Sequence, residues 1–272
     1  IGVLQNKGYE IAVNGRILDK GDWLLSLGVN FSYNSNKVLD LYYADKIYIS
    51  EQSLLPDYAV GKAFDMLYGP HSLGINPLTG YPVFRTADGG EKQASEVLEA
   101  EDIVALGHLT PPCTGGINFS LSYKSFDLNA DMYYVKGGIQ PFNYSYVRNQ
   151  DNAHRNAVSG QTEKMWFKPG DEEKAYANPF YTNATAEDNL SLYSNALTVG
   201  KSDYLKLSMV SLRYRLPSRF LRRNLPFVKY ASLALQGSNL FTWTAYSESD
   251  PESGTLAGSQ QPIYTVNVNL TF

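Results

Sequence analysis

The last nine residues of the chain, Tyr264 to Phe272, alternate strictly between two kinds of side chain. Apolar or aromatic residues occupy every even-numbered position, and uncharged polar residues occupy every odd-numbered one. Because successive side chains of a β-strand point to opposite faces, this stretch predicts a strand with one apolar and one polar face. A ring at the last position suits a strand of an outer-membrane barrel, where aromatic residues lie between hydrocarbon and headgroups.

The stretch from Trp23 to Tyr33 shows the same alternation over a greater length, and its apolar row begins and ends on aromatic rings. At about 3.3 Å per residue it spans roughly 33 Å, and a tilt of about 40° reduces this to about 25 Å, the height of an outer-membrane apolar band. A slip in the alternation at Met209–Val210 predicts a β-bulge. We expect the remaining strands over residues 9–18, 117–124, 126–134, 204–216 and 231–240.

The expected connections alternate in length, because short turns follow residues 18 and 124 whereas long irregular segments cover 34–112 and 137–202. Bacterial barrels have short periplasmic turns and long extracellular loops. The sequence therefore predicts an all-β fold, an antiparallel up-and-down transmembrane β-barrel. Seven strands would leave two unpaired edges in lipid, and such barrels have an even number of strands, so we expect more strands before Ile1. The chain begins without Met or a signal peptide, which indicates a piece of a longer protein.

Composition and motifs exclude several other classes. Charged residues make up 18% of the chain and its net charge is -4, which disfavours a nucleic-acid-binding protein. The single cysteine, Cys113, excludes an internal disulfide and any cysteine-based metal site. The sequence contains no run of about 18 apolar residues, so it predicts no transmembrane helix. The three histidines, His71, His108 and His154, lie far apart in predicted loops, and no metalloprotease, phosphate-loop or dinucleotide-binding spacing occurs, so we expect no enzyme.

Several short motifs follow one another along the chain: Asn6-Lys-Gly-Tyr-Glu10, Phe31-Ser-Tyr-Asn34, Thr114-Gly-Gly-Ile-Asn-Phe119, Asp203-Tyr-Leu-Lys-Leu207, Arg213-Tyr-Arg-Leu-Pro217, Ser238-Asn-Leu-Phe-Thr-Trp243 and Asp250-Pro-Glu252. In order and spacing they resemble the C-terminal barrel half of the SusC/RagA family. These are TonB-dependent outer-membrane transporters of Bacteroidetes. The resemblance extends from about Asn6 to Phe272.

The resemblance implies a barrel of about 22 strands in a Gram-negative, Bacteroidetes-type outer membrane. Residues 1–272 would be the C-terminal portion, holding the last seven or so strands, without the plug, the TonB box and the earlier strands. The implied function is import of oligosaccharides or peptides. The implied partners are a SusD-like surface lipoprotein, TonB-ExbB-ExbD through the missing N-terminal part, membrane lipid and the rest of the barrel, in a dimer of transporter-lipoprotein pairs. The terminal Phe272 resembles the signal by which outer-membrane proteins are inserted.

Two groups of aromatic residues are candidate sites. Those at strand ends form an expected lipid-facing girdle: Trp23, Tyr33, Tyr123, Phe126, Tyr134, Tyr214, Tyr264 and Phe272. Those in the long loops are candidates to stack on sugar rings or to contact a peptide, the alternative being that they pack the loops together or against the lipoprotein: Tyr42, Tyr43, Tyr48, Trp166, Phe167, Tyr176, Tyr181 and Tyr193.

Charged residues offer two further interpretations. Asp88, Glu91 and Asp102 are candidate ligands for a structural calcium ion, but the spacing of a calcium loop is absent, which favours a solvated acidic loop; no other cofactor is expected. Arg219, Arg222 and Arg223 would lie at the inner rim, either against lipid phosphates or as a solvated turn.

A soluble or surface-exposed all-β carbohydrate-binding module is the alternative function, because such a module is also tyrosine-rich and alternating. The two hypotheses differ in what the apolar rows face. A sandwich buries them, whereas a barrel exposes them on its outer wall. The barrel therefore predicts exposure of this set: Leu25, Leu27, Leu121, Leu212 and Val268.

Overall fold

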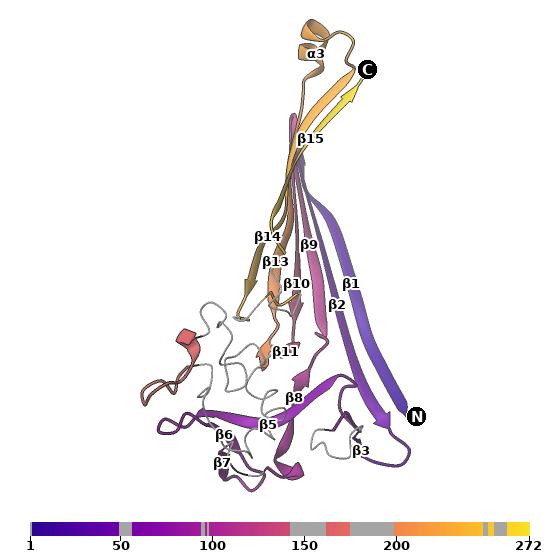
Figure 1. Ribbon diagram of the computed structural model, residues 1–272. Helices are drawn as coiled ribbons and strands as arrows, with labels where there is room; N and C mark the ends of the chain where they lie inside the picture. Colours follow the sequence, from indigo (N-terminus) through magenta and orange to yellow (C-terminus); the bar gives the residue numbers. More distant parts are fainter. Residues whose placement is uncertain are drawn as a thin grey trace.

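Seven long strands form one antiparallel sheet, in the order β1-β2-β9-β10-β13-β14-β15 (Figure 1). The computed structural model describes residues 2–48, 56–93, 96, 98–141, 162–174, 199–246, 250–252 and 260–272. The seven strands are β1 (Val3–Lys20), β2 (Trp23–Asp40), β9 (Cys113–Tyr123), β10 (Phe126–Lys136), β13 (Tyr204–Arg215), β14 (Tyr230–Thr244) and β15 (Ile263–Thr271). Each lies where the alternation predicts a strand, and the all-β, up-and-down arrangement is confirmed. The terminal strand β15 pairs with β14.

The strands β1 and β2 are longer than their alternation predicts, since they continue beyond Tyr9 and Tyr33 to a last pair between Val3 and Asp40. In this extension both faces carry mostly polar side chains. Polar and apolar side chains do not alternate regularly in this extension, so the sequence pattern gives no signal there, although the backbone ladder continues. The hydrophobic pattern therefore marks only the part of each strand that has one dry face.

Two irregularities change which face a residue occupies. In β13 the register slips at Ser208 against both neighbours, one residue from the predicted position, and the Ser208 hydroxyl donates to the Asp131 carbonyl at 2.8 Å. In β1 the register shifts between Arg16 and Leu18, which the sequence pattern did not predict. As a result Leu18, rather than Ile17, lies opposite Leu25.

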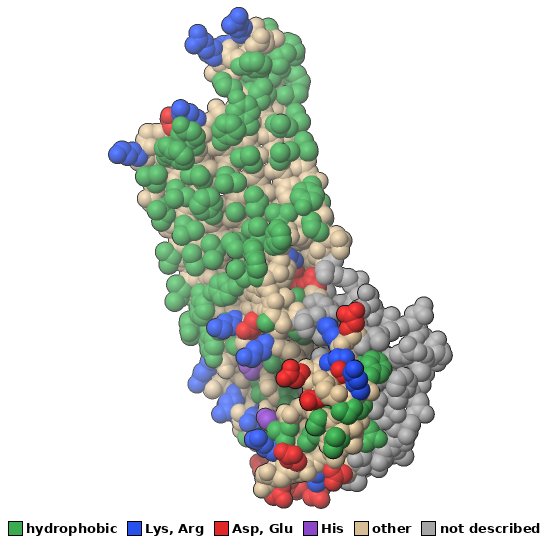
Figure 2. Space-filling model, turned by 90° about the vertical axis from the view of Figure 1, so that its left-hand side faces the viewer, with side chains coloured by type: hydrophobic (Ala, Val, Ile, Leu, Met, Phe, Trp, Pro, Cys, Tyr) green, Lys and Arg blue, Asp and Glu red, His purple; other side chains and the backbone are tan. Residues whose placement is uncertain are grey.

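One face of the sheet, the apolar face, is covered with hydrophobic side chains (Figure 2). The row that crosses all seven strands through directly paired residues is Leu18, Leu25, Leu121, Leu128, Leu212, Leu235 and Val266. All five residues predicted for an outer wall lie on this face. Leu212 is 43% and Val268 64% exposed, whereas Leu25, Leu27 and Leu121 are half-buried. No second sheet covers them within the described residues.

The opposite face, the polar face, carries amides, hydroxyls and charges. Asp127 and Asp131 lie here with polar partners. The Asp127 carboxylate accepts hydrogen bonds from Ser122 Oγ at 2.7 Å and from Arg215 at 3.0 Å. Asp131 accepts from the Asn118 amide at 2.8 Å. A sheet with one apolar and one hydrogen-bonded face is the wall expected of a transmembrane barrel.

The long segments form structure of their own at one end of the sheet (Figure 1). A four-stranded sheet has the order β7-β6-β5-β8, and two strand pairs, β3 with β4 and β11 with β12, flank it. The loop elements are β3 (Lys46–Ile47), β4 (Tyr58–Ala59), β5 (Met66–Ile75), β6 (Pro82–Arg85), β7 (Glu91–Gln93), η1 (Ala100–Asp102), β8 (Ile103–His108), β11 (Ile139–Pro141), η3 (Thr162–Lys164) and β12 (Val199–Lys201). The opposite end carries the helix α3 (Ser218–Asn224) and the C-terminus. In the described part of the chain, no helix is long and apolar enough to cross a membrane.

Candidate functional site

The polar face has a shallow hollow near the middle of the strands, with a volume of about 580 Å³. Its lining is rich in amide side chains, including Asn14, Asn118 and Asn129. A Cβ atom added at Gly28 would lie 2.4 Å from the Asn14 side-chain oxygen, so glycine gives that amide its space. Amides both donate and accept hydrogen bonds, which suits this wall for contact with a polar molecule or a polar protein segment.

A second polar cluster ties the connection between β14 and β15 to the wall. Lys206 of β13 is only 3% exposed, and its ammonium group donates to Glu252 and, at 3.1 Å, to the side-chain oxygen of Gln260. The Tyr133 hydroxyl of β10 donates to the other carboxylate oxygen of Glu252. One carboxylate on the loop therefore accepts hydrogen bonds from two neighbouring strands.

Asp250 shapes the same loop from within. Its carboxylate accepts from the backbone N–H of Glu252 at 3.0 Å and of Gln260 at 3.2 Å. The Asp250-Pro-Glu252 motif thus forms a turn, as its composition predicts, and also positions Glu252 toward Lys206. Sequence reasoning missed Lys206 and Tyr133, because nothing in a strand pattern indicates which loop residue will meet them.

The candidate cargo-contacting rings have different environments. Tyr42 and Tyr43 follow β2 and are 58% and 99% exposed, and Phe167 is 46% exposed. Tyr48 is half-buried. Trp166 is only 6% exposed, beside the fully buried Met165, so it differs from the other candidates in having no open ring surface. The other three candidates, Tyr176, Tyr181 and Tyr193, lie outside the described residues.

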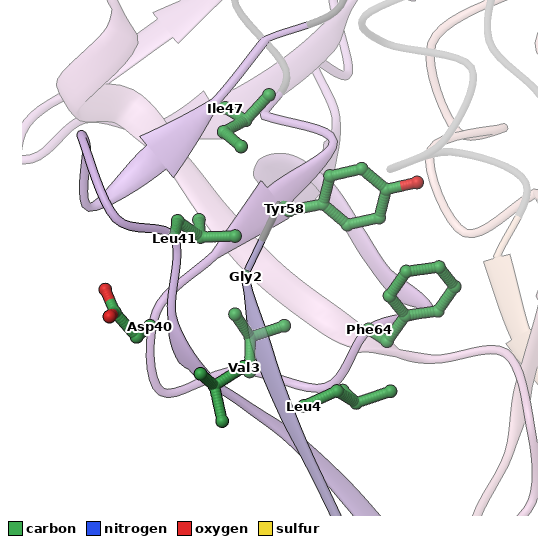
Figure 3. A pocket seen from close by; sticks show the side chains of 9 residues that line it. Gly2, Val3, Leu4, Asp40, Leu41, Ile47, Tyr58 and Phe64 are labelled. Atoms are coloured by element: carbon green, nitrogen blue, oxygen red, sulfur yellow. The ribbon is translucent and has the colours of Figure 1, made fainter.

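An apolar pocket of about 330 Å³ is lined in part by Leu41, the residue that precedes the two exposed tyrosines in the chain (Figure 3). It is enclosed between the outer ends of β1 and β2 and the segment that contains β3 and β4. The Tyr58 and Phe64 rings stack at 4.9 Å along one side, and Leu41 and Ile47 line it from the loop. This pocket has the size and polarity to accept one apolar side chain or the face of a ring.

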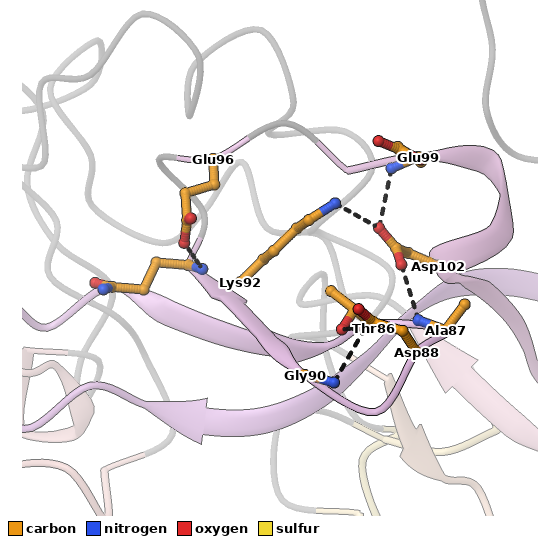
Figure 4. A network of polar contacts seen from close by, with 9 residues as sticks. Thr86, Ala87, Asp88, Gly90, Lys92, Glu96, Glu99 and Asp102 are labelled. Atoms are coloured by element: carbon orange, nitrogen blue, oxygen red, sulfur yellow. Dashed lines mark hydrogen bonds and ion pairs between the residues drawn. The ribbon is translucent and has the colours of Figure 1, made fainter.

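The acidic loop is organised around Asp102 (Figure 4). Asp102 is 5% exposed, and its carboxylate accepts from the N–H groups of Ala87 at 2.9 Å and Glu99 at 3.0 Å and from Lys92 at 3.1 Å. Burial raises the pKa of this carboxyl, but these donors outweigh burial and lower the pKa below its usual value. Asp88 instead accepts from Thr86 and Gly90. No group of three candidate ligands that could hold a metal occurs among the described residues.

Asp102→Asn should destabilise this loop sheet by about 1–3 kcal/mol near neutral pH, because the variant loses the charge that Lys92 and two N–H groups contact. A carboxyl with a lowered pKa stabilises the fold fully above its ordinary pKa of about 3.9, and this contribution disappears as the pH falls through the folded pKa. The measurement is the hydrogen-exchange protection of the Ala87 and Glu99 amides. The difference between variant and wild type should shrink below about pH 4, and the exposed control Glu101→Gln should match wild type throughout.

The predicted girdle residues lie on the apolar face, and several of them form paired ring contacts. Trp23 stacks on Tyr123 at 4.0 Å, and Phe126 lies 4.7 Å from Tyr214. At the opposite ends of the strands, Tyr33 stacks on Tyr9 at 5.4 Å. Tyr264 and Phe272 are 78% and 66% exposed. Additional rings on this face that the sequence reasoning did not select are Tyr9, Phe31, Phe241 and Trp243.

The ring of Tyr134 lies over a glycine, Gly115, on the same face. It pairs with Gly115 across β9 and β10, and a Cβ atom added at Gly115 would lie 2.5 Å from the Tyr134 ring. The ring therefore covers the glycine and restores a continuous apolar surface there. In the sequence pattern alone, Gly115 is only an interruption in the row of apolar side chains.

Comparison with known proteins agrees with this geometry. No family model matches the chain. The chain is 27% identical to TonB-dependent receptor P3 of Formosa agariphila, over 100% of this chain and 27% of that protein, and 25% identical to receptor P26 of the same organism, over 93% and 26%. It superposes on a chain of the RagAB peptide transporter with a TM-score of 0.77, at 21% identity, over its whole length and 29% of that chain. The open-open state of the RagAB peptide importer gives a TM-score of 0.74.

The chain is thus similar in sequence to TonB-dependent receptors and shares its fold with part of the RagAB transporter. The resemblance carried by the sequence motifs is confirmed, and the RagAB comparison supports the partial-barrel fold. Relatives of this kind are outer-membrane proteins and not enzymes, which places the chain in the outer membrane. The chain spans somewhat over a quarter of the length of these TonB-dependent receptors.

Proposed function

We propose that the protein containing this chain imports oligosaccharides or peptides across the outer membrane in a TonB-dependent manner. This chain would be its C-terminal portion and supply barrel wall and extracellular loops. The observation that carries the proposal is the two-faced sheet: an uncovered apolar face with rings toward its ends, and a polar face with an amide-lined hollow of about 580 Å³. The first face suits lipid and the second suits a wet lumen.

The proposed partners follow from the same assignment. The wall would pair with the rest of its own barrel along β1 and β15, the two edge strands of the sheet. A SusD-like lipoprotein would meet the loop end, and TonB-ExbB-ExbD would act through segments outside this chain. The solved RagAB structures are of a peptide importer, and by analogy we propose a transporter-lipoprotein pair, assembled as a dimer of such pairs.

A carbohydrate-binding module fits less well. Such a module buries its apolar rows between two sheets, whereas Leu235 and Val266 on the apolar face are 53% and 65% exposed. The rings on this face gather toward the ends of the strands, which a sandwich core does not require. The comparisons with receptors point the same way.

We propose that cargo is contacted where the exposed loop rings adjoin the apolar pocket. Tyr42 and Tyr43 have centroids 6.5 Å apart, and the adjacent Leu41 lines the pocket. A sugar ring or an apolar peptide side chain would enter the pocket while the tyrosines contact its neighbour. Rigid aromatic rings provide such contact area with little loss of side-chain entropy.

The double replacement Tyr42→Ala/Tyr43→Ala should raise the concentration of cargo needed for half-maximal uptake about tenfold. The reason is that each aromatic ring contributes about 0.5–1.5 kcal/mol of binding free energy. The measurement is uptake of labelled oligosaccharide and peptide mixtures by a strain that expresses the full-length gene, compared with a gene deletion and a tonB deletion. The matched control is Leu78→Ala, an exposed apolar residue between β5 and β6. An equal loss in the control would remove the tyrosines from the cargo site, and uptake that survives loss of tonB would refute the import proposal itself.

A further inference from the structure

The connection between β13 and β14 carries three arginines on one side of a short helix. Arg219, Arg222 and Arg223 occupy positions i, i+3 and i+4 of α3, which share one face of a helix. All three are exposed, and none forms an ion pair with a carboxylate of the described residues. Three neighbouring like charges repel one another, so this face is complementary to an anion.

The helix holds these side chains on a fixed base. Leu221 points the opposite way and is 2% exposed, in a cluster with Val228 and Ala231. The Leu225 N–H donates to the Leu221 carbonyl at 2.7 Å, and the Lys229 N–H donates to the Thr271 carbonyl of β15 at 2.7 Å. The arginines therefore project from a platform anchored to the end of the sheet rather than from an open turn.

Exposed rings lie beside the arginines. Phe220 of the same helix is 50% exposed, and Phe227 and Phe272 are 62% and 66% exposed. The rings of Phe227 and Phe272 stack at 6.3 Å with an interplanar angle of 6°. Because Phe272 ends the apolar row of β15, the ring surface continues the apolar face, and basic side chains project from the same end of the molecule (Figure 2).

We propose that this end of the protein binds an anionic membrane phospholipid, with its phosphate on Arg219, Arg222 and Arg223 and its acyl chains against Phe220, Phe227 and Phe272. Guanidinium groups match phosphate oxygens in two-point hydrogen bonds. The rings provide the adjoining apolar surface, continuous with the face assigned to lipid. The site lies at the end with short connections, so the lipid belongs to the periplasmic leaflet. The inference depends on the outer-membrane location and on neither cargo nor TonB.

The test uses the full-length protein, delipidated in detergent and titrated with phosphatidylglycerol, with bound lipid counted by native mass spectrometry. The variant Arg219→Gln/Arg222→Gln/Arg223→Gln should bind the most tightly held phosphatidylglycerol molecule more weakly. We expect the affinity to fall about fivefold for each charge removed. A variant with Lys at all three positions keeps the charges but loses the two-point hydrogen bonds, so its affinity should lie between those of wild type and the glutamine variant, which shows that the site and fold persist. Phe220→Ala/Phe227→Ala should also weaken binding.

The matched control removes three exposed cations from the other end, Lys7→Gln/Lys46→Gln/Lys168→Gln, and should bind phosphatidylglycerol as wild type does. Equal affinity of wild type and the triple arginine variant would overturn the proposal, as would an equal loss in the lysine control. Displacement of the lipid by millimolar inorganic phosphate would also overturn it, because it would assign the arginines to free phosphate.

Discussion

Replacing the buried Lys206 with methionine should lower the free energy of unfolding of the full-length protein by about 3 kcal/mol. Lys206 is 3% exposed and donates to Glu252 and Gln260. Methionine retains most of the side-chain volume but leaves the Glu252 carboxylate with Tyr133 alone. Removing one partner of a buried ion pair leaves an uncompensated charge, which costs more than the pair contributes. The measurement is chemical unfolding in phospholipid vesicles, followed by tryptophan fluorescence.

A double-mutant cycle separates the pair from simple loss of packing. Because Glu252→Gln removes the charge that Lys206 neutralises, Lys206→Met should cost about 2 kcal/mol less in that background. Lys201→Met, at an exposed position in β12, is the matched control and should stay within about 0.5 kcal/mol of wild type. A Lys206 variant as stable as the Lys201 variant would show that the connection between β14 and β15 is held by other contacts.

The sequence predicted the sheet well because alternation reports which solvent each face of a strand meets. Leu121 and Ser122 are consecutive residues of β9. The apolar side chain of the first and the polar side chain of the second are enough to predict that they point to opposite faces. The same logic fails where polar and apolar residues do not alternate regularly, which is why the extensions of β1 and β2 to Val3 and Asp40 were missed. It also fails for α3, because seven residues are too few to show a helical period.

The candidate site was predictable only in part, because its contacts join residues far apart in the chain. Lys206 and Glu252 are 46 residues apart, and no periodic pattern encodes their pairing. Composition selected Tyr43, which is 99% exposed, together with Trp166, which is 6% exposed, and could not distinguish them. A tryptophan next to the fully buried Met165 has the same sequence signal whether it packs inward or points to solvent.

A charge placed on the apolar face should destabilise the sheet strongly. Val268 is 64% exposed and occupies the middle of the apolar row from Tyr264 to Phe272. If that row faces hydrocarbon, Val268→Arg should destabilise the full-length protein by about 2–4 kcal/mol in vesicles, the cost of arginine near the bilayer midplane. It should also reduce the amount assembled in the outer membrane, measured by heat-modifiable mobility of membrane fractions.

Asn267→Arg is the matched control, because the adjacent residue sits at nearly the same height and points to the polar face. In a water-filled or polar interior this arginine remains solvated, so its cost should be less than about 1 kcal/mol. The difference between the two variants reports the environment of each face, since strand, depth and added side chain are held constant. Equal costs would mean that both faces meet similar surroundings, and the lipid-facing assignment of Val268 would then be wrong.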